Sequence, residues 1–192
     1  LHGAIGVGGA NGTSMACALM RFLPPLMPKV MVSTVAATAA VQWYIAESDI
    51  CMFPSIGDLS LNRITRSVME NAANAVAAMA IGRNSTEIAN DAQRLIGVSS
   101  FGGTAACVDR VSERLVSAGY EVIHFHASGP GGRALESLAE AGELAGVIDV
   151  TTHELTDLIV DGVYSAGDGR LKSAGAAGLP QIVIPGALDH AN

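Results

Sequence analysis

The chain has little positive charge and few charged side chains of any kind. Only 15% of its 192 residues are charged, and its two lysines are Lys29 and Lys172. The net charge is −7, and residues 96–192 carry twelve acidic against five basic side chains. Proteins that bind nucleic acids present a basic stripe to the phosphate backbone. We therefore expect no nucleic-acid partner.

Cysteines and long apolar runs are also scarce. The three cysteines, Cys17, Cys51 and Cys107, are odd in number, far apart and set among apolar residues. This pattern predicts buried free thiols in a reducing compartment such as the cytoplasm. Lys29 and Gln42 interrupt the longest apolar stretch, so we expect neither a transmembrane helix nor a membrane partner.

The composition nevertheless suits a folded protein. Hydrophobic residues make up 49% of the chain, which argues against disorder, and the length suffices for one α/β domain or two small ones. The chain opens at Leu1 with no initiator methionine and no basic, apolar leader. We expect no signal peptide and a chain cut from a longer protein.

The second half repeats one physical unit, in which an apolar run ends at a glycine-rich loop and a helical pattern follows. The predicted strands end near residues 100, 125, 150 and 184, and the predicted helices lie between them. Gly119 and Gly142 are positioned to end two of these helices, and Thr151 and Glu154 are spaced as a capping box for the third. Strands that alternate with helices in this way pair in parallel through right-handed crossovers.

The first half shows the same alternation less regularly. Strands are predicted at residues 3–7, 29–32 and 49–53, with a helix over residues 15–22 and an ambiguous segment over residues 36–45. A long helix follows, for which Asp58 or Ser60 is the expected cap and Gly82 the expected end. Residues 83–90 are polar and lack periodicity, so we expect a domain boundary there.

The sequence therefore predicts an α/β protein with two Rossmann-like, parallel-sheet domains. Residues 1–82 form the later part of a first domain that is incomplete at its N-terminus and ends in a long bridging helix. Residues 83–192 form a second domain that continues beyond the chain. Ligands of such sheets bind at the carboxyl ends of the strands, where the glycine-rich loops lie.

Two of these loops are candidates for anion binding. Residues 8–13 place backbone amides at a helix N-terminus, which favours an anion, although the loop lacks the lysine of a P-loop and a tight turn explains the glycines equally well. In residues 128–133, Arg133 begins a helix and opposes its dipole at a cost of roughly 0.3–1 kcal/mol, which a bound anion would reverse. Alternatively, Arg133 reaches Glu136 or solvent.

Histidines near the same edge allow acid–base chemistry. His126 lies on the same strand face as His124, and with His153, Glu154 and neighbouring carboxylates it could form an acid–base pair. Ordinary packing of one imidazole and loop capping by another are the alternative. Zinc-ligand spacing is missing, so we expect no metal site. The catalytic candidates are His126, His153 and Glu154.

Six segments together resemble one known family. They are residues 8–13 (GGANGT), 32–36 (VSTVA), 58–64 (DLSLNRI), 126–134 (HASGPGGRA), 151–155 (TTHEL) and 185–189 (PGALD). In order and spacing the chain resembles the family of the tomato mosaic virus resistance protein, which has bacterial and fungal members. The resemblance implies two Rossmann-like domains that meet at a cleft, ATP binding at the glycine-rich loops, with Mg²⁺ as an accompanying ion, and, in the plant member, inhibition of a viral replication protein. It also implies strands before Leu1 and a segment after Asn192.

The resemblance and the loop chemistry together give a set of nucleotide-contact candidates. Among them, Phe101 could stack on a base, and Thr151 and Thr152 could contact a ribose or a Mg²⁺-bound phosphate. The full set is Gly8, Gly9, Asn11, Gly12, Thr13, Phe101, Thr104, Ser128, Gly129, Gly131, Gly132, Arg133, Thr151 and Thr152.

The sequence departs from the family pattern at three positions. The family resemblance implies a bulkier residue than Gly102, and threonine in place of Ala105 and of His153. We expect a cytoplasmic ATP-binding protein, and a homodimer is suggested by the family and by exposed sheet edges. Two alternatives remain: an enzyme acting on a phosphorylated or carboxylated small molecule with a histidine general base, and a protein-interaction module.

Overall fold

The computed structural model describes residues 1–85 and 94–192. The chain divides into two compact units, Leu1–Ile88 and Ala89–Asn192, here called unit 1 and unit 2. Each contains a fully parallel sheet whose strands alternate with helices. The predicted α/β class with Rossmann-like sheets is confirmed. Most of the boundary predicted at residues 83–90 lies outside the described residues.

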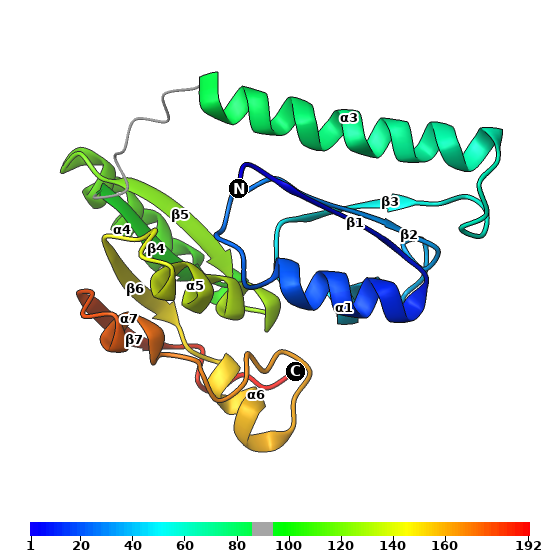
Figure 1. Cartoon of the computed structure of the whole chain (residues 1–192). Coiled ribbons are helices and arrows are strands. Elements are labelled where there is room, and N and C mark those ends of the chain that lie inside the picture. The colour runs from blue at the N-terminus through cyan, green and yellow to red at the C-terminus, as the bar shows by residue number, and fades with distance from the viewer. Residues whose placement is uncertain (86–93) are drawn as a thin grey trace. The chain divides into compact units, whose positions relative to one another are not determined.

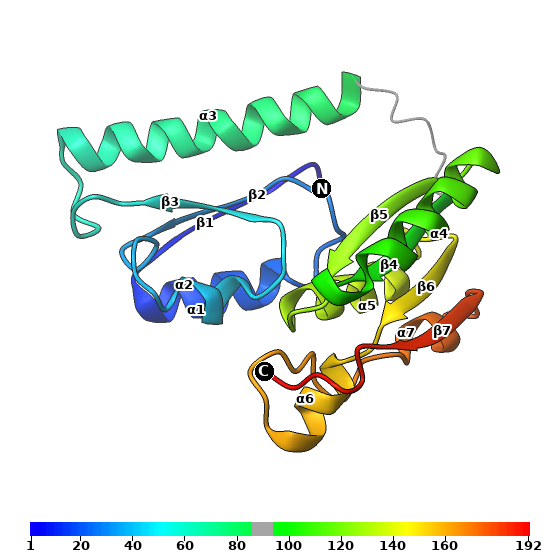
Figure 2. The ribbon, with the colours of Figure 1, turned by 180° about the vertical axis from the view of Figure 1, so that it is seen from behind.

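Unit 1 is a three-stranded sheet with helices on both faces. The strand order is β1-β2-β3, and α1 and α2 lie on one face while α3 runs along the other (Figures 1 and 2). Its elements are β1 (Ala4–Gly8), α1 (Ala10–Met20), β2 (Lys29–Ser33), α2 (Val41–Ile45), β3 (Ile50–Pro54) and α3 (Arg63–Ser85).

The central strand β2 supplies the core of unit 1. All five of its residues are buried, because the strand has a neighbour on each side and helices above and below. Met31 packs toward α1 with Cys17 and Met20, whereas Val30 and Val32 pack toward α3. The period-2 alternation of strand side chains therefore divides between two apolar clusters.

Two helix ends in unit 1 differ from the prediction. Helix α1 begins at Ala10 inside the glycine-rich loop, and α3 continues past Gly82 to Ser85. Neither Asp58 nor Ser60 caps α3. The cap is Asn62, whose Oδ1 accepts hydrogen bonds from the amides of Ile64 at 2.9 Å and Thr65 at 3.1 Å.

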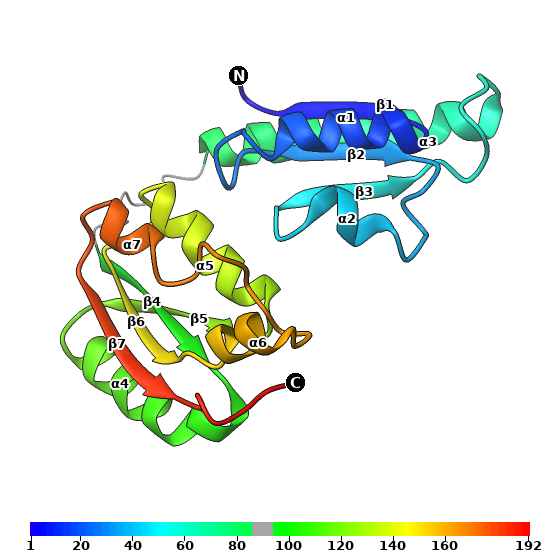
Figure 3. The same cartoon turned by 90° about the horizontal axis from the view of Figure 1, so that it is seen from below.

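Unit 2 is a four-stranded sheet with the order β5-β4-β6-β7 (Figure 3). Helix α4 packs on one face, and α5 and α7 pack on the other. Its elements are β4 (Leu95–Ser100), a one-turn 3-10 helix (Gly102–Thr104), α4 (Ala105–Ser117), β5 (Glu121–His126), α5 (Pro130–Glu140), β6 (Gly146–Thr151), α6 (Glu154–Val160), α7 (Ser173–Ala176) and β7 (Gln181–Gly186).

In unit 2, the C-terminal ends of the helices agree with the prediction from glycine positions better than their N-terminal starts do. Gly119 and Gly142 have φ values of 85° and 74°, the left-handed conformation that ends a helix, as predicted. Helix α5 starts at Pro130, before Arg133, which was predicted to begin it, because proline suits the first helical position. Helix α7 was not predicted.

The prediction of three buried thiols is wrong for two of them. Cys17 is buried, and burial raises the pKa of its thiol, whereas Cys51 and Cys107 are exposed. All three are free. Ile50 and Met52, the neighbours of Cys51, point to the opposite face of β3, and Ala105 and Ala106, the neighbours of Cys107, are themselves exposed. Neither pair therefore covers the sulfur atom. Across residues 1–85 and 94–192, no helix is long and apolar enough to cross a membrane.

Candidate functional site

The strand order places a topological switch point in unit 2. From β4 the chain crosses to β5 on one side, and β6 pairs with the other side of β4. In open parallel sheets, ligands bind at the carboxyl ends of the strands at such a point. The segments after β4 and β6, residues 101–104 and 152–154, therefore lie where a ligand is expected.

Two nucleotide-contact candidates at this point bond to each other. The hydroxyl oxygens of Thr104 and Thr151 lie 2.6 Å apart, and the amide of Thr151 donates to Ser99 Oγ at 3.1 Å. The predicted capping box is wrong, since α6 follows His153 without any side-chain cap. Both side chains of the expected box make tertiary hydrogen bonds instead.

Glu154 fills the anion position of the loop before α5. Its buried carboxylate accepts hydrogen bonds from the amides of Gly129 at 2.7 Å and Gly132 at 3.2 Å. Arg170 Nε donates to the same carboxylate at 2.7 Å. The two amides predicted to hold a phosphate therefore already hold a carboxylate of the chain, and this carboxylate is fully engaged.

Arg170 gathers three carboxylates into one buried network. Its guanidinium bonds Glu136 at 3.0 Å and also bonds Asp149 and Glu154. Burial by itself would lower the pKa of Arg170, but the carboxylates of Asp149 and Glu154 raise it above its ordinary value. Asp149, which is fully buried, is thus part of the interior of unit 2.

The remaining candidates of this loop have backbone partners. Arg133 Nη1 donates to the carbonyl of Ser165 at 3.3 Å, and the amide of Ser128 donates to the carbonyl of His126 at 2.8 Å. Gly129 has a φ of 88°, which favours glycine, and a Cβ on Gly131 would collide with the His126 carbonyl. The glycines of this loop are explained by its geometry.

A cluster of five rings lies at the same edge, with Phe101 at its centre. The Phe101 ring is 4.3 Å from His153 and 5.5 Å from His126, measured between centroids. Tyr164 and His190 lie 6.4 Å and 6.2 Å from it. Two of the catalytic candidates, His126 and His153, thus share one aromatic neighbour. His124, which was predicted to share a strand face with His126, lies apart from the rings and bonds Ser112.

His153, a member of this cluster, and the adjacent Thr152 are buried with unpaired polar atoms. Both ring nitrogens of His153 and the hydroxyl of Thr152 have no hydrogen-bond partner among the described residues. Burial lowers the pKa of His153, partly opposed by Glu154 and Asp157, so the imidazole is neutral near pH 7. A neutral imidazole offers one donor and one acceptor.

In unit 1, the loop before α1 leaves its amides open. Gly9 precedes the helix without a side-chain cap, and the first backbone bond of the helix runs from Thr13 N to Gly9 O at 2.8 Å. The amides of Ala10, Asn11 and Gly12 therefore have no acceptor in the described part of the chain.

Three other candidates of the unit 1 loop have structural roles. The Thr13 hydroxyl is buried and lies 2.6 Å from Ser33 Oγ. A Cβ on Gly8 would come within 2.7 Å of Gly12 Cα, so Gly8 permits the close approach of α1 to β1. Gly8, Gly12 and Thr13 thus fix the position of the open amides.

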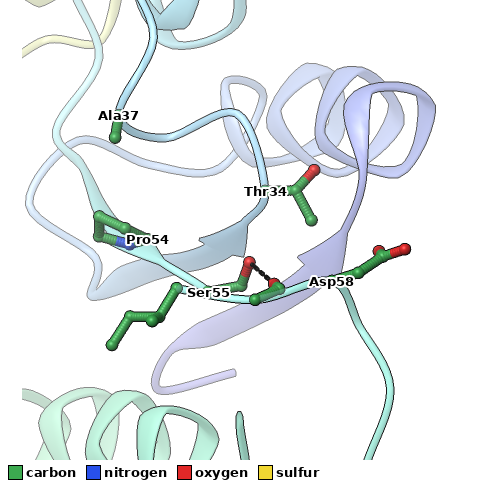
Figure 4. Close-up of a pocket in the computed structure, with 7 residues that line it drawn as sticks. Thr34, Ala37, Pro54, Ser55 and Asp58 are labelled. Carbon is green, nitrogen blue, oxygen red and sulfur yellow. Dashed lines mark hydrogen bonds between the residues drawn. The ribbon is translucent and has the colours of Figure 1, made fainter. Parts of the chain in front are cut away.

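An open pocket of about 490 Å³ lies at the carboxyl ends of β2 and β3. Figure 4 shows the side chains of Thr34, Ser55 and Asp58 around it. The pocket adjoins the glycine-rich loop, because Thr34 N bonds the Gly8 carbonyl at 3.3 Å and Thr34 Oγ1 lies 3.7 Å from the Cβ position of Gly9.

Several site residues could not be found from the sequence. Arg170 lies in a Gly- and Asp-rich stretch without periodicity, where an arginine is ordinarily solvated, so nothing indicated its burial. Tyr164 and His190 join the ring cluster from segments with equally little pattern. For the pocket, one signal was available: Ser55 follows a predicted strand, so it was expected at the carboxyl edge of the sheet. Among residues 1–85 and 94–192, no group of three or more His, Cys, Asp or Glu side chains could hold a metal.

Two parallel-sheet units with glycine-rich turns at their carboxyl edges make this chain a Rossmann-like α/β protein. It belongs to the uncharacterised protein family UPF0261. The model of the family's N-terminal domain matches residues 1–85, and that of its C-terminal domain matches residues 93–192.

Named relatives agree with the resemblance predicted from the motifs, which is confirmed. The chain is 41% identical over its whole length to the ToMV resistance protein Tm-1 of Solanum lycopersicum, and covers 26% of it. It is 44% identical to a UPF0261 protein of Clostridium tetani and 45% identical to one of Rhizobium meliloti, and covers 47% of each. The chain thus spans about half of the bacterial relatives and about a quarter of the tomato protein.

Proposed function

We propose that the chain is a nucleotide-binding protein whose unit 1 takes the phosphates of ATP on the amides of Ala10, Asn11 and Gly12. The observation that carries the proposal is that these amides have no acceptor among the described residues and lie beside an open pocket. Free amides and the positive end of a helix dipole favour a phosphate.

The pocket suits the rest of the ligand. Its volume of about 490 Å³ falls in the usual range for small-molecule sites, roughly 300–1,000 Å³. The Asp58 carboxylate can accept hydrogen bonds from ribose hydroxyls, as acidic residues do in other Rossmann-like proteins. Because the loop has no lysine, Mg²⁺ would accompany the triphosphate and reduce its charge.

The second glycine-rich loop is the weaker location for the phosphates. Its amides at Gly129 and Gly132 already bond Glu154, which Arg170 holds in place. A phosphate there would have to displace a buried carboxylate from three hydrogen bonds. Among residues 1–85 of unit 1, no carboxylate bonds the amides of Ala10, Asn11 and Gly12.

The test is thermal unfolding with and without Mg-ATP. A ligand that binds the native state at a hundred times its Kd stabilises it by about 2.7 kcal/mol. Asn11→Asp places a carboxylate in the first turn of α1, where it competes for the same amides and repels phosphate. We expect it to remove most of the ATP-induced rise in melting temperature.

Asn74→Asp is the matched control. Asn74 is exposed in the middle of α3, so the substitution adds the same charge away from the loop. The control should keep the full ATP effect. A saturable ATP effect that Asn11→Asp leaves intact would place the nucleotide elsewhere, and absence of any effect would reject the proposal.

A further inference from the structure

Unit 2 contains a group of buried polar atoms that the ATP proposal does not use. The Thr152 hydroxyl and both nitrogens of His153 lack partners among the described residues, and the two side chains are 2% and 0% exposed. A buried polar group without a hydrogen bond destabilises the folded state, so native proteins rarely retain three together without a purpose.

These atoms lie at the switch point of the sheet, where strand order alone would place a ligand. Thr152 and His153 directly follow β6, and the neighbouring strand β4 leads into Phe101. The Phe101 ring lies 4.3 Å from the His153 ring, and the exposed imidazole of His126 stacks on Phe101 with 5.5 Å between the ring centroids. Segments distant in the sequence thus converge on the same place.

A second polar feature adjoins the cluster. Gly102 and Gly103 follow Phe101 at the start of the helical segment that continues as α4, and both are exposed. Their amides have no acceptor in the described part of the chain, and a Cβ on either would meet nothing within 4 Å. Two free amides at a helix start favour an oxyanion.

We infer that the carboxyl edge of the unit 2 sheet binds a small phosphorylated or carboxylated metabolite. Its acidic group lies on the amides of Gly102 and Gly103, and a hydroxyl or carbonyl of the ligand bonds Thr152 and the neutral imidazole of His153. The exposed His126 and His190 lie at the rim of the ring cluster. None of its residues belongs to the proposed ATP site in unit 1.

The experiment follows the ring signals of the five histidines by NMR near pH 7 during titration with three probes. Inorganic phosphate tests the oxyanion alone, glycerol 3-phosphate tests a phosphorylated ligand, and L-malate tests a carboxylated one. His153→Gln assigns the signal of His153. We expect at least one probe to move that signal saturably, and the preferred probe distinguishes the two ligand classes.

Thr152→Val separates binding from folding. The Thr152 hydroxyl has no partner in the described part of the chain, so the variant should be as stable as the wild-type chain without ligand, yet bind the probe about tenfold more weakly. Thr156→Val is the control: its hydroxyl donates to the Leu188 carbonyl at 2.8 Å, so it should lose stability and keep the affinity.

Three results would overturn the inference. They are a His153 signal that no probe moves, movement confined to His126 and His190, and a Thr152→Val variant that binds normally or is destabilised without ligand. ATP binding in unit 1 is measured independently through Asn11→Asp, so failure of one proposal does not decide the other.

Discussion

The glycine-rich turns before α1 and α5 have similar local structure but differ in whether a carboxylate of the chain bonds their amides. Each joins a strand to a helix of 11 residues that has no acidic residue in its first turn. The turn before α1 leaves three amides open, whereas two amides of the turn before α5 donate to Glu154, a residue 22 and 25 positions further along the chain. A glycine-rich turn therefore defines a place for an anion, and tertiary structure decides whether the chain itself supplies that anion.

The largest expected effect comes from removing Arg170, the cation that holds Glu154 in the turn before α5. Arg170→Met leaves the carboxylates of Glu136, Asp149 and Glu154 buried without their counter-ion. Breaking a buried ion pair in this way costs about 3–5 kcal/mol. Urea unfolding should show this loss, and Arg133→Met, at a half-buried arginine of α5, should show much less. Equal losses of stability in the two variants would mean that the Arg170 network stabilises unit 2 no more than the contacts of Arg133 do.

A smaller loss, of about 3 kcal/mol, is expected for Glu154→Ala, which empties the filled turn. Added acetate should restore part of the stability, because the amides of Gly129 and Gly132 and the Arg170 guanidinium then accept an external carboxylate. The control is Glu140→Ala, at an exposed carboxylate that accepts from Ser173 Oγ. If acetate stabilised both variants equally, specific filling of the turn would be excluded.

Unit 2 should also lose stability in mild acid through His153, which directly precedes Glu154. Burial lowers the pKa of His153 from 6.5 in the folded state, outweighing Glu154 and Asp157, while His126 and His190 act in the same direction as burial. Below 6.5 the unfolded chain binds a proton that the folded chain does not. The free energy of unfolding therefore decreases as the pH decreases below 6.5. The total loss is up to about 1.4 kcal/mol for each unit by which folding lowers the pKa of His153.

Urea unfolding at about pH 7.5 and about pH 5.5 measures this dependence. His153→Phe should reduce the difference between the two pH values, because it removes the buried titrating group. His124→Gln, at an exposed histidine, should leave the difference unchanged. An unchanged difference in His153→Phe would assign the acid sensitivity to other groups.

The smallest expected effect comes from adding one carboxylate to each turn, which compares the two turns directly. Without ATP, Asn11→Asp should stabilise unit 1 by about 0.3–1 kcal/mol, because an acid in the first turn of α1 interacts favourably with the open amides. Ser128→Asp, next to the turn before α5, should destabilise unit 2, since the new carboxylate faces amides that Glu154 already occupies. Thermal unfolding gives both signs. A gain in both variants would contradict the difference between the turns.

Local patterns were sufficient to predict the class of fold and the position of the strands. Alternating apolar residues and glycine-rich breaks located the strands, and Gly119 and Gly142 located two helix ends, because these signals depend on nearby residues. The strand order β5-β4-β6-β7 depends on pairing between distant segments, so the switch point was not predictable. Helix α1 began early because glycine and asparagine tolerate a first turn that their intrinsic propensities disfavour.

The bonding partners of the candidate residues were predicted less well than the positions of their loops in the fold. The spacing of Thr151 and Glu154 fitted a capping box, but bonds to Thr104 and to Gly129 compete with that local arrangement and prevail. Arg170 had no sequence signal, since its burial follows from three acids that lie on other elements. The candidate loops were located correctly at the carboxyl edges, and the distinction between open and filled turns required coordinates.

The Arg170 network also has a consequence for the lifetime of the folded state. Its three ion-pair partners are 16, 21 and 34 residues away in the sequence, so α5, β6 and α6 must all be docked before the network is complete. Interactions that form after the folding transition state change the unfolding rate more than the folding rate. Arg170 should therefore act mainly as a kinetic clamp: it lengthens the time for which unit 2 stays folded and limits access of proteases to its interior.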